Sequence, residues 1–178
     1  MMINFLKKVA ILVISSSTAY ASSYVSVSSI HTKIKDPDFK YLNKDSVSLN
    51  VGYSYEFKNK VNVALQTNRL NSPQRFNVVS RNNGATMQSK SKVNNDTFLV
   101  GYRLKRLSPS VFISNTQIKK TLSYQGEIIG RERKSGLVYG ASLNYFITRH
   151  VAASLILVEP KKEFYLRRSL GVGINYIF

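Results

Sequence analysis

The chain lacks cysteine, has only two histidines, and contains no long hydrophobic run beyond its first two dozen residues. Without cysteine there is no disulfide framework, and metal sites built on thiolates are excluded. His31 and His150 form no recognisable ligand cluster, so we expect neither a metal site nor a cofactor. The longest later apolar run, Val151 to Val158, contains Ser154 and is far shorter than the roughly twenty residues of a transmembrane helix. If the chain enters lipid, a closed β-barrel is the remaining way to satisfy its backbone groups.

Acidic residues are also scarce. Nine Asp and Glu residues stand against 26 Lys and Arg residues, which gives a formal net charge of +17. The basic residues are scattered over several connections and no nucleic-acid recognition motif accompanies them, so we expect no nucleic-acid binding. Lipopolysaccharide phosphates, host glycans that are sulfated or sialylated, and anionic matrix proteins are better candidate partners.

The first 21 residues predict a cleavable secretory signal. Lys7 and Lys8 supply a positive start, Val9 to Ile14 a short apolar core, and Ala19-Tyr20-Ala21 the pattern that signal peptidase reads. A membrane anchor is the alternative, but a core of about six strongly apolar residues is too short to span a bilayer. We therefore expect residues 1–21 to be removed and residues 22–178 to form the mature chain, with 24 basic and 9 acidic residues and a net charge of +15.

Apolar and polar residues alternate along the mature chain with the period of two that a β-strand imposes. Eight such segments can be counted, at roughly 23–33, 45–57, 60–70, 96–105, 110–122, 135–147, 151–159 and 164–178. In a membrane barrel the apolar face meets lipid and the small or polar face lines the lumen. A soluble lipocalin-like barrel would invert the two faces, but the small, nearly uncharged polar face suits a narrow lumen better than a solvent surface. The pattern thus predicts an all-β fold, an eight-stranded antiparallel up-and-down transmembrane β-barrel.

The connections fall into two classes. Those around 58–60, 106–109 and 148–150 are short, whereas 71–95 and 125–134 are long and polar and are predicted to be loops. Small outer-membrane barrels show this asymmetry between periplasmic turns and external loops. The segment 110–122 has an ambiguous phase that a β-bulge would reset. The predicted interior is only wide enough for side chains, and Glu56 and Arg103 are expected to pair there with each other or with water.

The last strand carries a family resemblance. Leu170, Val172, Ile174, Tyr176 and Phe178 form an apolar face that ends on an aromatic residue. Together with the signal and the alternation, this strand resembles the C-terminal signal strand of small bacterial outer-membrane barrels of the OmpX/Ail, opacity-protein and OmpA transmembrane-domain type. The resemblance implies insertion by the barrel-assembly machinery through Tyr176 and Phe178, a Gram-negative outer-membrane location, a monomer, and a role in adhesion, serum resistance or envelope structure.

Basic residues at the expected external ends are the candidate functional residues. That region holds 18 basic and 8 acidic residues, among them the polyanion-binding candidates Arg131, Arg133, Lys134, Lys161, Lys162, Arg167 and Arg168. Arginine suits phosphate and sulfate by charge and by its planar fork of donors. Arg168 shares the lipid-facing phase of the last strand and is expected close to the outer interface.

Three functions remain open at this stage. The first is a surface interaction protein that binds polyanions, the second a purely structural barrel whose positive rim bridges lipopolysaccharide, and the third a lipid A-modifying enzyme. The enzyme is disfavoured because neither histidine belongs to a His-x-Ser pair, and Ser154 lies four residues from His150 on the opposite face. We therefore expect no catalytic residues.

Overall fold

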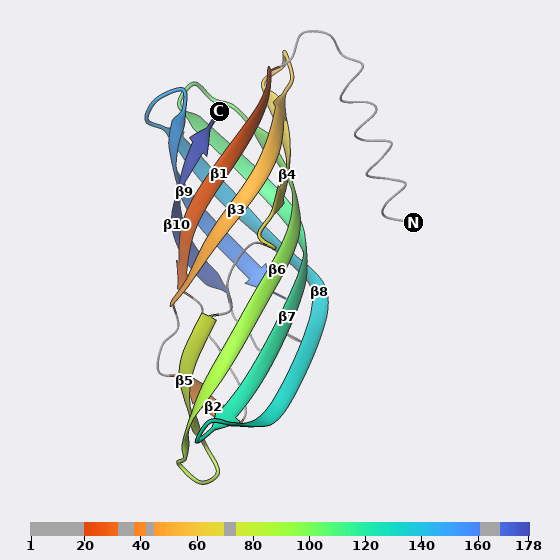
Figure 1. Cartoon of the computed structure of the whole chain (residues 1–178). Helices are drawn as coiled ribbons and strands as arrows, with labels where there is room; N and C mark the ends of the chain where they lie inside the picture. The colour runs from red at the N-terminus through yellow and green to blue at the C-terminus, as the bar shows by residue number, and fades with distance from the viewer. Residues whose placement is uncertain (1–19, 32–37, 42–44, 70–73, 161–167) are drawn as a thin grey trace.

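The computed structural model describes residues 20–31, 38–41, 45–69, 74–160 and 168–178, and these ranges are β-structure joined by turns (Figure 1). The strands are β1 (Tyr20–His31), β2 (Phe39–Tyr41), β3 (Asp45–Glu56), β4 (Val61–Thr67), β5 (Gln74–Ser80), β6 (Thr86–Tyr102), β7 (Leu107–Tyr124), β8 (Glu127–Phe146), β9 (Val151–Pro160) and β10 (Ser169–Ile177). Within the described ranges, no helix has the length and apolarity that a membrane crossing requires. The expected signal, residues 1–21, lies almost wholly outside these ranges and stays a prediction.

Eight of the strands close into a ring. Antiparallel pairing runs through β6, β4, β3, β1, β10, β9, β8 and β7, and the pairing of β6 with β7 closes the circle. The seam between the first and last ring strands is a continuous ladder from Tyr24 opposite Ile177 to His31 opposite Leu170. The predicted eight-stranded antiparallel up-and-down architecture is therefore confirmed.

The two faces of the ring follow the predicted alternation. Val47, Val111 and Ile174 point outward, and the last two are more than 60% exposed. The alternate positions line the interior with small polar side chains such as Ser26, Ser28, Asn50, Ser114 and Ser154. An apolar outside around a polar inside is the arrangement of a barrel that lipid surrounds.

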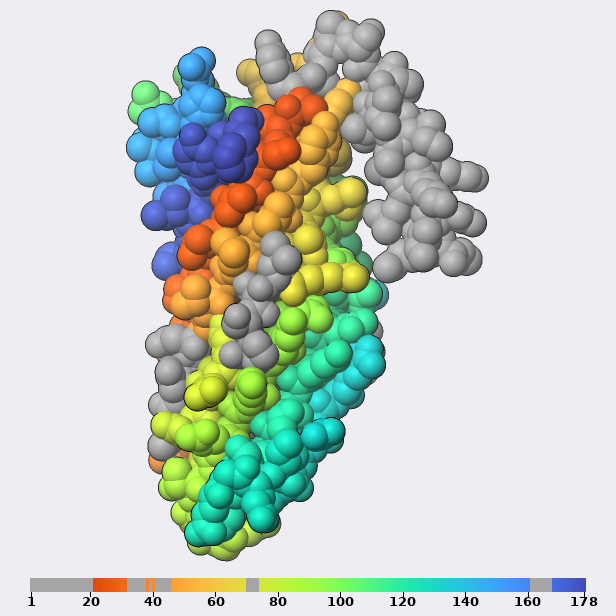
Figure 2. All heavy atoms as spheres, viewed as in Figure 1, coloured from red at the N-terminus to blue at the C-terminus, as the bar shows by residue number. Residues whose placement is uncertain are grey.

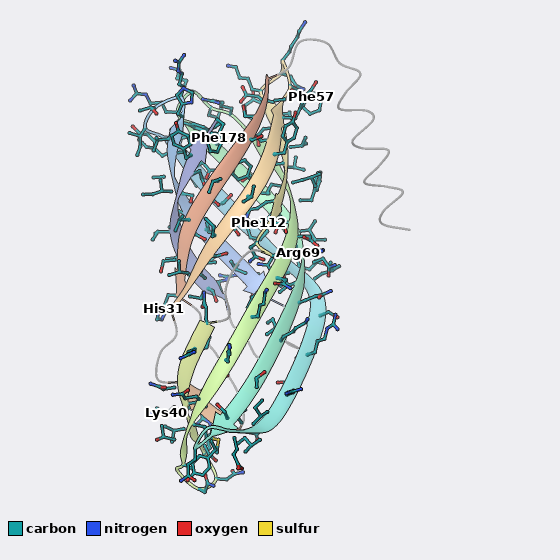
Figure 3. All side chains as sticks on the ribbon, in the orientation of Figure 1. His31, Lys40, Phe57, Arg69, Phe112 and Phe178 are labelled. Atoms are coloured by element: carbon teal, nitrogen blue, oxygen red, sulfur yellow. The ribbon has the colours of Figure 1, made fainter. Side chains whose placement is uncertain are left out.

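One end of the barrel, here called the short-turn end, carries the three connections 57–60, 103–106 and 147–150. These connections are short, as predicted. Aromatic side chains gather at this end: the rings of Tyr55 and Phe57 are 4.8 Å apart, and those of Tyr176 and Phe178 are 5.0 Å apart, both edge to face. Figure 3 shows Phe57 and Phe178 near each other at this end, with Lys40 at the opposite end.

The opposite end differs from the prediction, because two expected loops are strands. Residues 71–95 contain β5 and the first half of β6, which pair from Gln74 opposite Ser91 to Val79 opposite Thr86. Residues 125–134 belong to the long β7–β8 hairpin, whose connection is only Gln125-Gly126. These strands were missed because strands that rise beyond the lipid need no apolar outer face, so their hydropathy does not alternate clearly. We call β2, β5 and residues 86–95, 115–124 and 127–137 of β6, β7 and β8 the protruding sheet (Figure 1).

The phase of β7, which the sequence left ambiguous, is regular over residues 108–120. Even-numbered residues from Ser108 to Lys120 line the interior, Phe112 and Ile118 included, while Val111 and Ile113 point outward. The register shifts only between Leu122 and Ser123, near the tip of the hairpin. The apparent ambiguity arose because β7 carries large apolar residues on both faces.

Candidate functional site

The outer surface changes character where the barrel becomes the protruding sheet. On β7 the outward positions run from Val111 and Ile113 to Asn115, Gln117 and Lys119. Neighbouring strands change at matching points: Asp96 follows Phe98 outward on β6 and pairs with Asn115 in the ladder. The apolar band therefore ends below the row of Asp96 and Asn115, and the surface beyond it is polar.

Six basic residues share this outer surface beyond the band. Arginines and lysines occupy alternate positions on four adjacent strands: Arg75 on β5, Lys90 and Lys92 on β6, Lys119 on β7, and Arg131 and Arg133 on β8. We call these six residues the cationic face. Figure 2 shows the strands that carry it side by side at the protruding end, coloured from yellow-green to cyan. The face exists because the β5–β6 and β7–β8 hairpins, which are distant from each other in sequence, are joined into one sheet by the pairing of β6 with β7.

The ladder registers arrange the cationic face in two rows. Lys92 lies opposite Lys119, which lies opposite Arg133, so three cations stand abreast on three strands. In the second row Arg75 lies opposite Lys90, and Thr121 separates Lys90 from Arg131. Directly opposed residues have Cβ atoms about 5 Å apart, and like charges at such positions destabilise a sheet. The rows are therefore an electrostatic cost to the isolated fold that a bound anion would relieve.

The nearest carboxylates do not neutralise this face. Asp96 is held by Arg69, whose Nε donates to Asp96 Oδ1 at 3.1 Å and whose second nitrogen contacts the other oxygen. This guanidinium holds the pKa of the Asp96 carboxyl below its usual value. Glu132 lies on the inward side of β8, and its Oε1 forms an ion pair with Lys134 Nζ at 2.9 Å. Within the described ranges, none of the six basic residues has an ion-pair partner.

The structure brings together only part of the predicted site. Arg131 and Arg133 belong to the cationic face, and Arg133 also donates to Gln117 Oε1 at 3.4 Å. Lys134 does not belong to it, since one residue along a strand reverses the direction of the side chain. Arg168 is outward as predicted, but its Nε donates to Glu159 Oε2 at 2.7 Å. Lys161, Lys162 and Arg167 lie outside the described residues.

Four members of the cationic face were not named from the sequence as polyanion-binding candidates, although they were counted among the 18 external basic residues. These four are Arg75, Lys90, Lys92 and Lys119. The signal that identifies them is the spacing of two in Lys90-Ser-Lys92 and Arg131-Glu-Arg133. On a strand this spacing puts both charges on one face. It was missed because residues 86–95 were expected to be a loop.

The two residues predicted to signal insertion lie at the end of the last strand, and their role stays a prediction. Tyr176 and Phe178 are outward at the short-turn end, 49% and 68% exposed. His150 stacks on Tyr176 with ring centroids 6.3 Å apart, and its Nδ1 lies 2.9 Å from the carbonyl oxygen of Ile177. His150 thus contacts the end of β10 through both its ring and its Nδ1. Among the described residues no three His, Asp or Glu side chains gather into a metal site.

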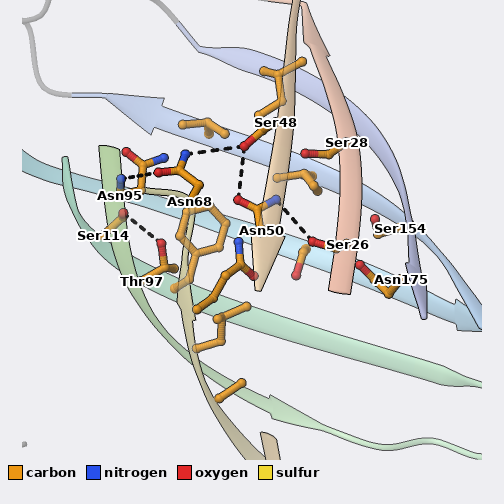
Figure 4. Close-up of a pocket in the computed structure, with 18 of the residues that line it drawn as sticks. Ser26, Ser28, Ser48, Asn50, Asn68, Asn95, Thr97, Ser114, Ser154 and Asn175 are labelled. Carbon is orange, nitrogen blue, oxygen red and sulfur yellow. Dashed lines mark hydrogen bonds between the residues drawn. The ribbon is translucent and has the colours of Figure 1, made fainter. Parts of the chain in front are cut away.

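The lumen is held together by a network of amides and hydroxyls (Figure 4). Asn68 donates to Ser48 at 3.4 Å, Ser48 donates to Asn50 at 3.1 Å, and Asn50 donates to Ser26 at 3.2 Å, while Thr97 donates to Ser114 at 2.9 Å. The Ser48–Asn50 bond lies within β3, and the other three link neighbouring segments of the ring. They satisfy buried polar atoms, which would otherwise be costly in a low-dielectric surrounding.

The short-turn end of the lumen holds a charged pair. Arg103 donates to Glu56 at 3.2 Å, as predicted, and its guanidinium lies 4.0 Å from the ring centre of Phe146. Above this pair the interior is less filled than expected, because a cavity of about 440 Å³ remains among the luminal side chains.

Comparisons with known proteins bear on the fold. No protein-family model and no curated protein sequence matches the chain. Among solved structures, it is similar to Ail, the attachment invasion locus protein of Yersinia pestis, in complex with the heparin analogue sucrose octasulfate, with a TM-score of 0.62 and 18% identity over 89% of this chain and 97% of that one. Another structure of Ail gives a TM-score of 0.60 at 18% identity, over 89% of this chain and 97% of that one.

A third similar structure is Neisserial surface protein A, with a TM-score of 0.50 and 12% identity over 89% of this chain and 99% of that one. TM-scores at this level show a shared fold, and identities below 20% leave activity open. The ring of eight strands, the apolar outside and these similarities lead to one conclusion. The chain has the fold of the small outer-membrane β-barrel proteins of the OmpX/Ail type.

Proposed function

We propose that this chain is an outer-membrane surface protein whose cationic face binds phosphorylated or sulfated saccharides. The observation that carries the proposal is the row of Lys92, Lys119 and Arg133, three cations abreast without an acidic partner among the described residues. A row of like charges is unfavourable unless anions lie against it. Lysine and arginine bind phosphate and sulfate groups through charge-assisted hydrogen bonds.

The position of the face supports the same chemistry. It begins directly above the row of Asp96 and Asn115, where the apolar band ends. In an outer membrane this is the level of lipopolysaccharide phosphates, and it is also open to host glycans. The two sources present the same anionic groups, so the face is assigned to the shared chemistry and the source is left to experiment. The similar protein Ail has been crystallised with sucrose octasulfate, which shows that this fold accommodates such a ligand in one protein.

Binding of sucrose octasulfate and of purified lipopolysaccharide to the folded protein in neutral nanodiscs tests the proposal. The variant Lys92→Ala/Lys119→Ala/Arg133→Ala should weaken binding by about 10- to 100-fold, since each exposed charge contact contributes roughly 0.5–1 kcal/mol. The matched control Lys58→Ala/Arg106→Ala/Arg149→Ala removes the same charge at the short-turn end and should bind as the parent does. Molar salt should abolish binding, because it screens exposed charges. Equal affinity for both variants would contradict the proposal.

Which ligand the protein binds distinguishes a structural role from a role in adhesion. Binding of lipopolysaccharide alone, with increased detergent sensitivity of cells that carry the first variant, favours the purely structural barrel. Binding of sulfated host glycans favours adhesion. The proposed role is non-enzymatic, and lipid A recovered chemically unaltered after overexpression is the result we expect.

A further inference from the structure

The tip of the β7–β8 hairpin carries a β-bulge that exposes two isoleucines. Ile128 pairs with Ser123 and Gly130 with Leu122, so Ile129 has no ladder partner of its own. Consecutive residues of a regular strand point to opposite faces, but Ile128 and Ile129 are 54% and 52% exposed. Bulges often serve to re-aim a side chain. Here the bulge puts two large apolar residues into solvent together.

This apolar tip lies far from the lipid that surrounds the barrel. Tyr124, itself 39% exposed, is nine positions beyond Asn115, which is about 30 Å along the strand. Figure 1 shows the β7–β8 connection near the end of the molecule opposite the chain's C-terminus. The membrane that holds the barrel therefore does not cover Tyr124, Ile128 and Ile129, which we call the apolar tip.

The surroundings of the apolar tip are positive. Arg131 follows Gly130 on the same strand, and Lys90 and Arg75 continue its row across the sheet. Arg81 lies in the adjacent β5–β6 turn. Glu127, the first residue of β8, is acidic and pairs with Tyr124 in the ladder. Exposed isoleucine and tyrosine beside lysine and arginine are the composition that binds an anionic lipid surface, with apolar side chains at the acyl boundary and cations at the headgroups.

We propose that the apolar tip inserts into the headgroup region of a second bilayer, one that contains anionic phospholipid and faces the membrane that holds the barrel. The inference rests on the proposed function for the part played by the cationic face, but the apolar tip adds a contact that a soluble saccharide would not use. A second copy of the chain fits the surface less well, because two such faces would bring cation against cation. An anionic bilayer complements both the charge and the exposed apolar groups.

The experiment uses the folded protein in neutral nanodiscs and floats it with vesicles of phosphatidylcholine alone or with 30% phosphatidylglycerol added. We expect flotation with the anionic vesicles only. Ile128→Ser/Ile129→Ser should reduce it about tenfold or more, while sucrose octasulfate binding stays at the parent level. Ile147→Ser is the matched control, since Ile147 is equally exposed (55%) in a turn at the short-turn end. A gel mobility shift on heating verifies that each variant is folded.

A second variant reports insertion directly, because the chain has no tryptophan. The single tryptophan of Ile128→Trp should shift its emission to the blue and be quenched by brominated lipids in anionic vesicles, whereas that of Ile147→Trp should not. Three outcomes would overturn the inference: no preference for anionic vesicles, flotation unchanged by the serine variant, or an Ile128→Trp signal that the vesicles leave unaltered. If Lys92→Ala/Lys119→Ala/Arg133→Ala abolishes flotation and Ile128→Ser/Ile129→Ser does not change it, the second of these outcomes holds and only a polyanion site remains.

Discussion

At the scale of single residues, the luminal pair of Arg103 and Glu56 is the most testable interaction. Arg103→Met leaves a half-buried carboxylate without its partner, and we expect the free energy of unfolding to fall by about 1–3 kcal/mol, less than for a fully buried pair. Glu56→Gln added to Arg103→Met should restore part of that loss. Arg106→Met, which changes an exposed cation three residues on, should cost under about 0.5 kcal/mol. Urea unfolding followed by circular dichroism and gel mobility provides the values, and equal effects at 103 and 106 would contradict the assigned pair.

The same scale shows what the sequence can predict of a site. For Arg103 and Glu56, pairing with each other or with water could be predicted, because each is a charge on the inward phase of a well-patterned strand. Lys134 was wrongly grouped with Arg131 and Arg133. Basic residues that are adjacent in sequence point to opposite faces when the segment is a strand, and Lys134 points inward. Whether adjacent charges share a face depends on secondary structure, and that segment had been predicted as a loop.

At the scale of elements, the β7–β8 hairpin depends on its two-residue turn. Gln125 and Gly126 have φ values of 50° and 91°, the left-handed region that a tight hairpin of this kind requires. Gly126→Ala should therefore destabilise the tip by about 1 kcal/mol. Gly130→Ala is the control on the same hairpin, since the nearest atom to its added methyl is the Leu122 Cβ at 3.9 Å. Amide hydrogen exchange at residues 119–131 should accelerate in the first variant and not in the second.

The elements inside the apolar band were predictable and those beyond it were not. Lipid outside and polar groups inside give each ring strand a strong two-residue pattern, as in Asp45–Glu56 and Ser169–Ile177. The protruding sheet has polar residues on its outer face, so its hydropathy does not alternate and the segment 71–95 reads as a loop. The β6–β7 pairing that joins its two hairpins is set by hydrogen-bond register between segments distant in sequence, which a local pattern cannot show. The cationic face was missed for the same reason.

At the scale of the whole molecule, ring closure sets how much of the N-terminus the barrel needs. β1 begins at Tyr20, but its pairing with β10 begins at Tyr24, and the amide of Phe178 donates to the carbonyl of Ser23. Cleavage after Ala21 would remove only the pairs of Tyr20 and Ala21 with β3. The closing seam would stay complete.

We therefore expect a chain that starts at Ser22 to fold into a barrel that resists unfolding by SDS until it is heated, with the same mobility shift as protein recovered from the outer membrane. A chain that starts at Val27 loses three of the eight pairs of the seam, Tyr24 to Ser26, and should lose the shift. Because an open edge exposes unpaired backbone groups to lipid, a ring that fails to close has no stable place in a membrane. Mass spectrometry of the recovered protein locates its first residue. A mature start well before Ser22, or a chain from Ser22 that shows no shift, would mean that residues of the expected signal belong to the barrel.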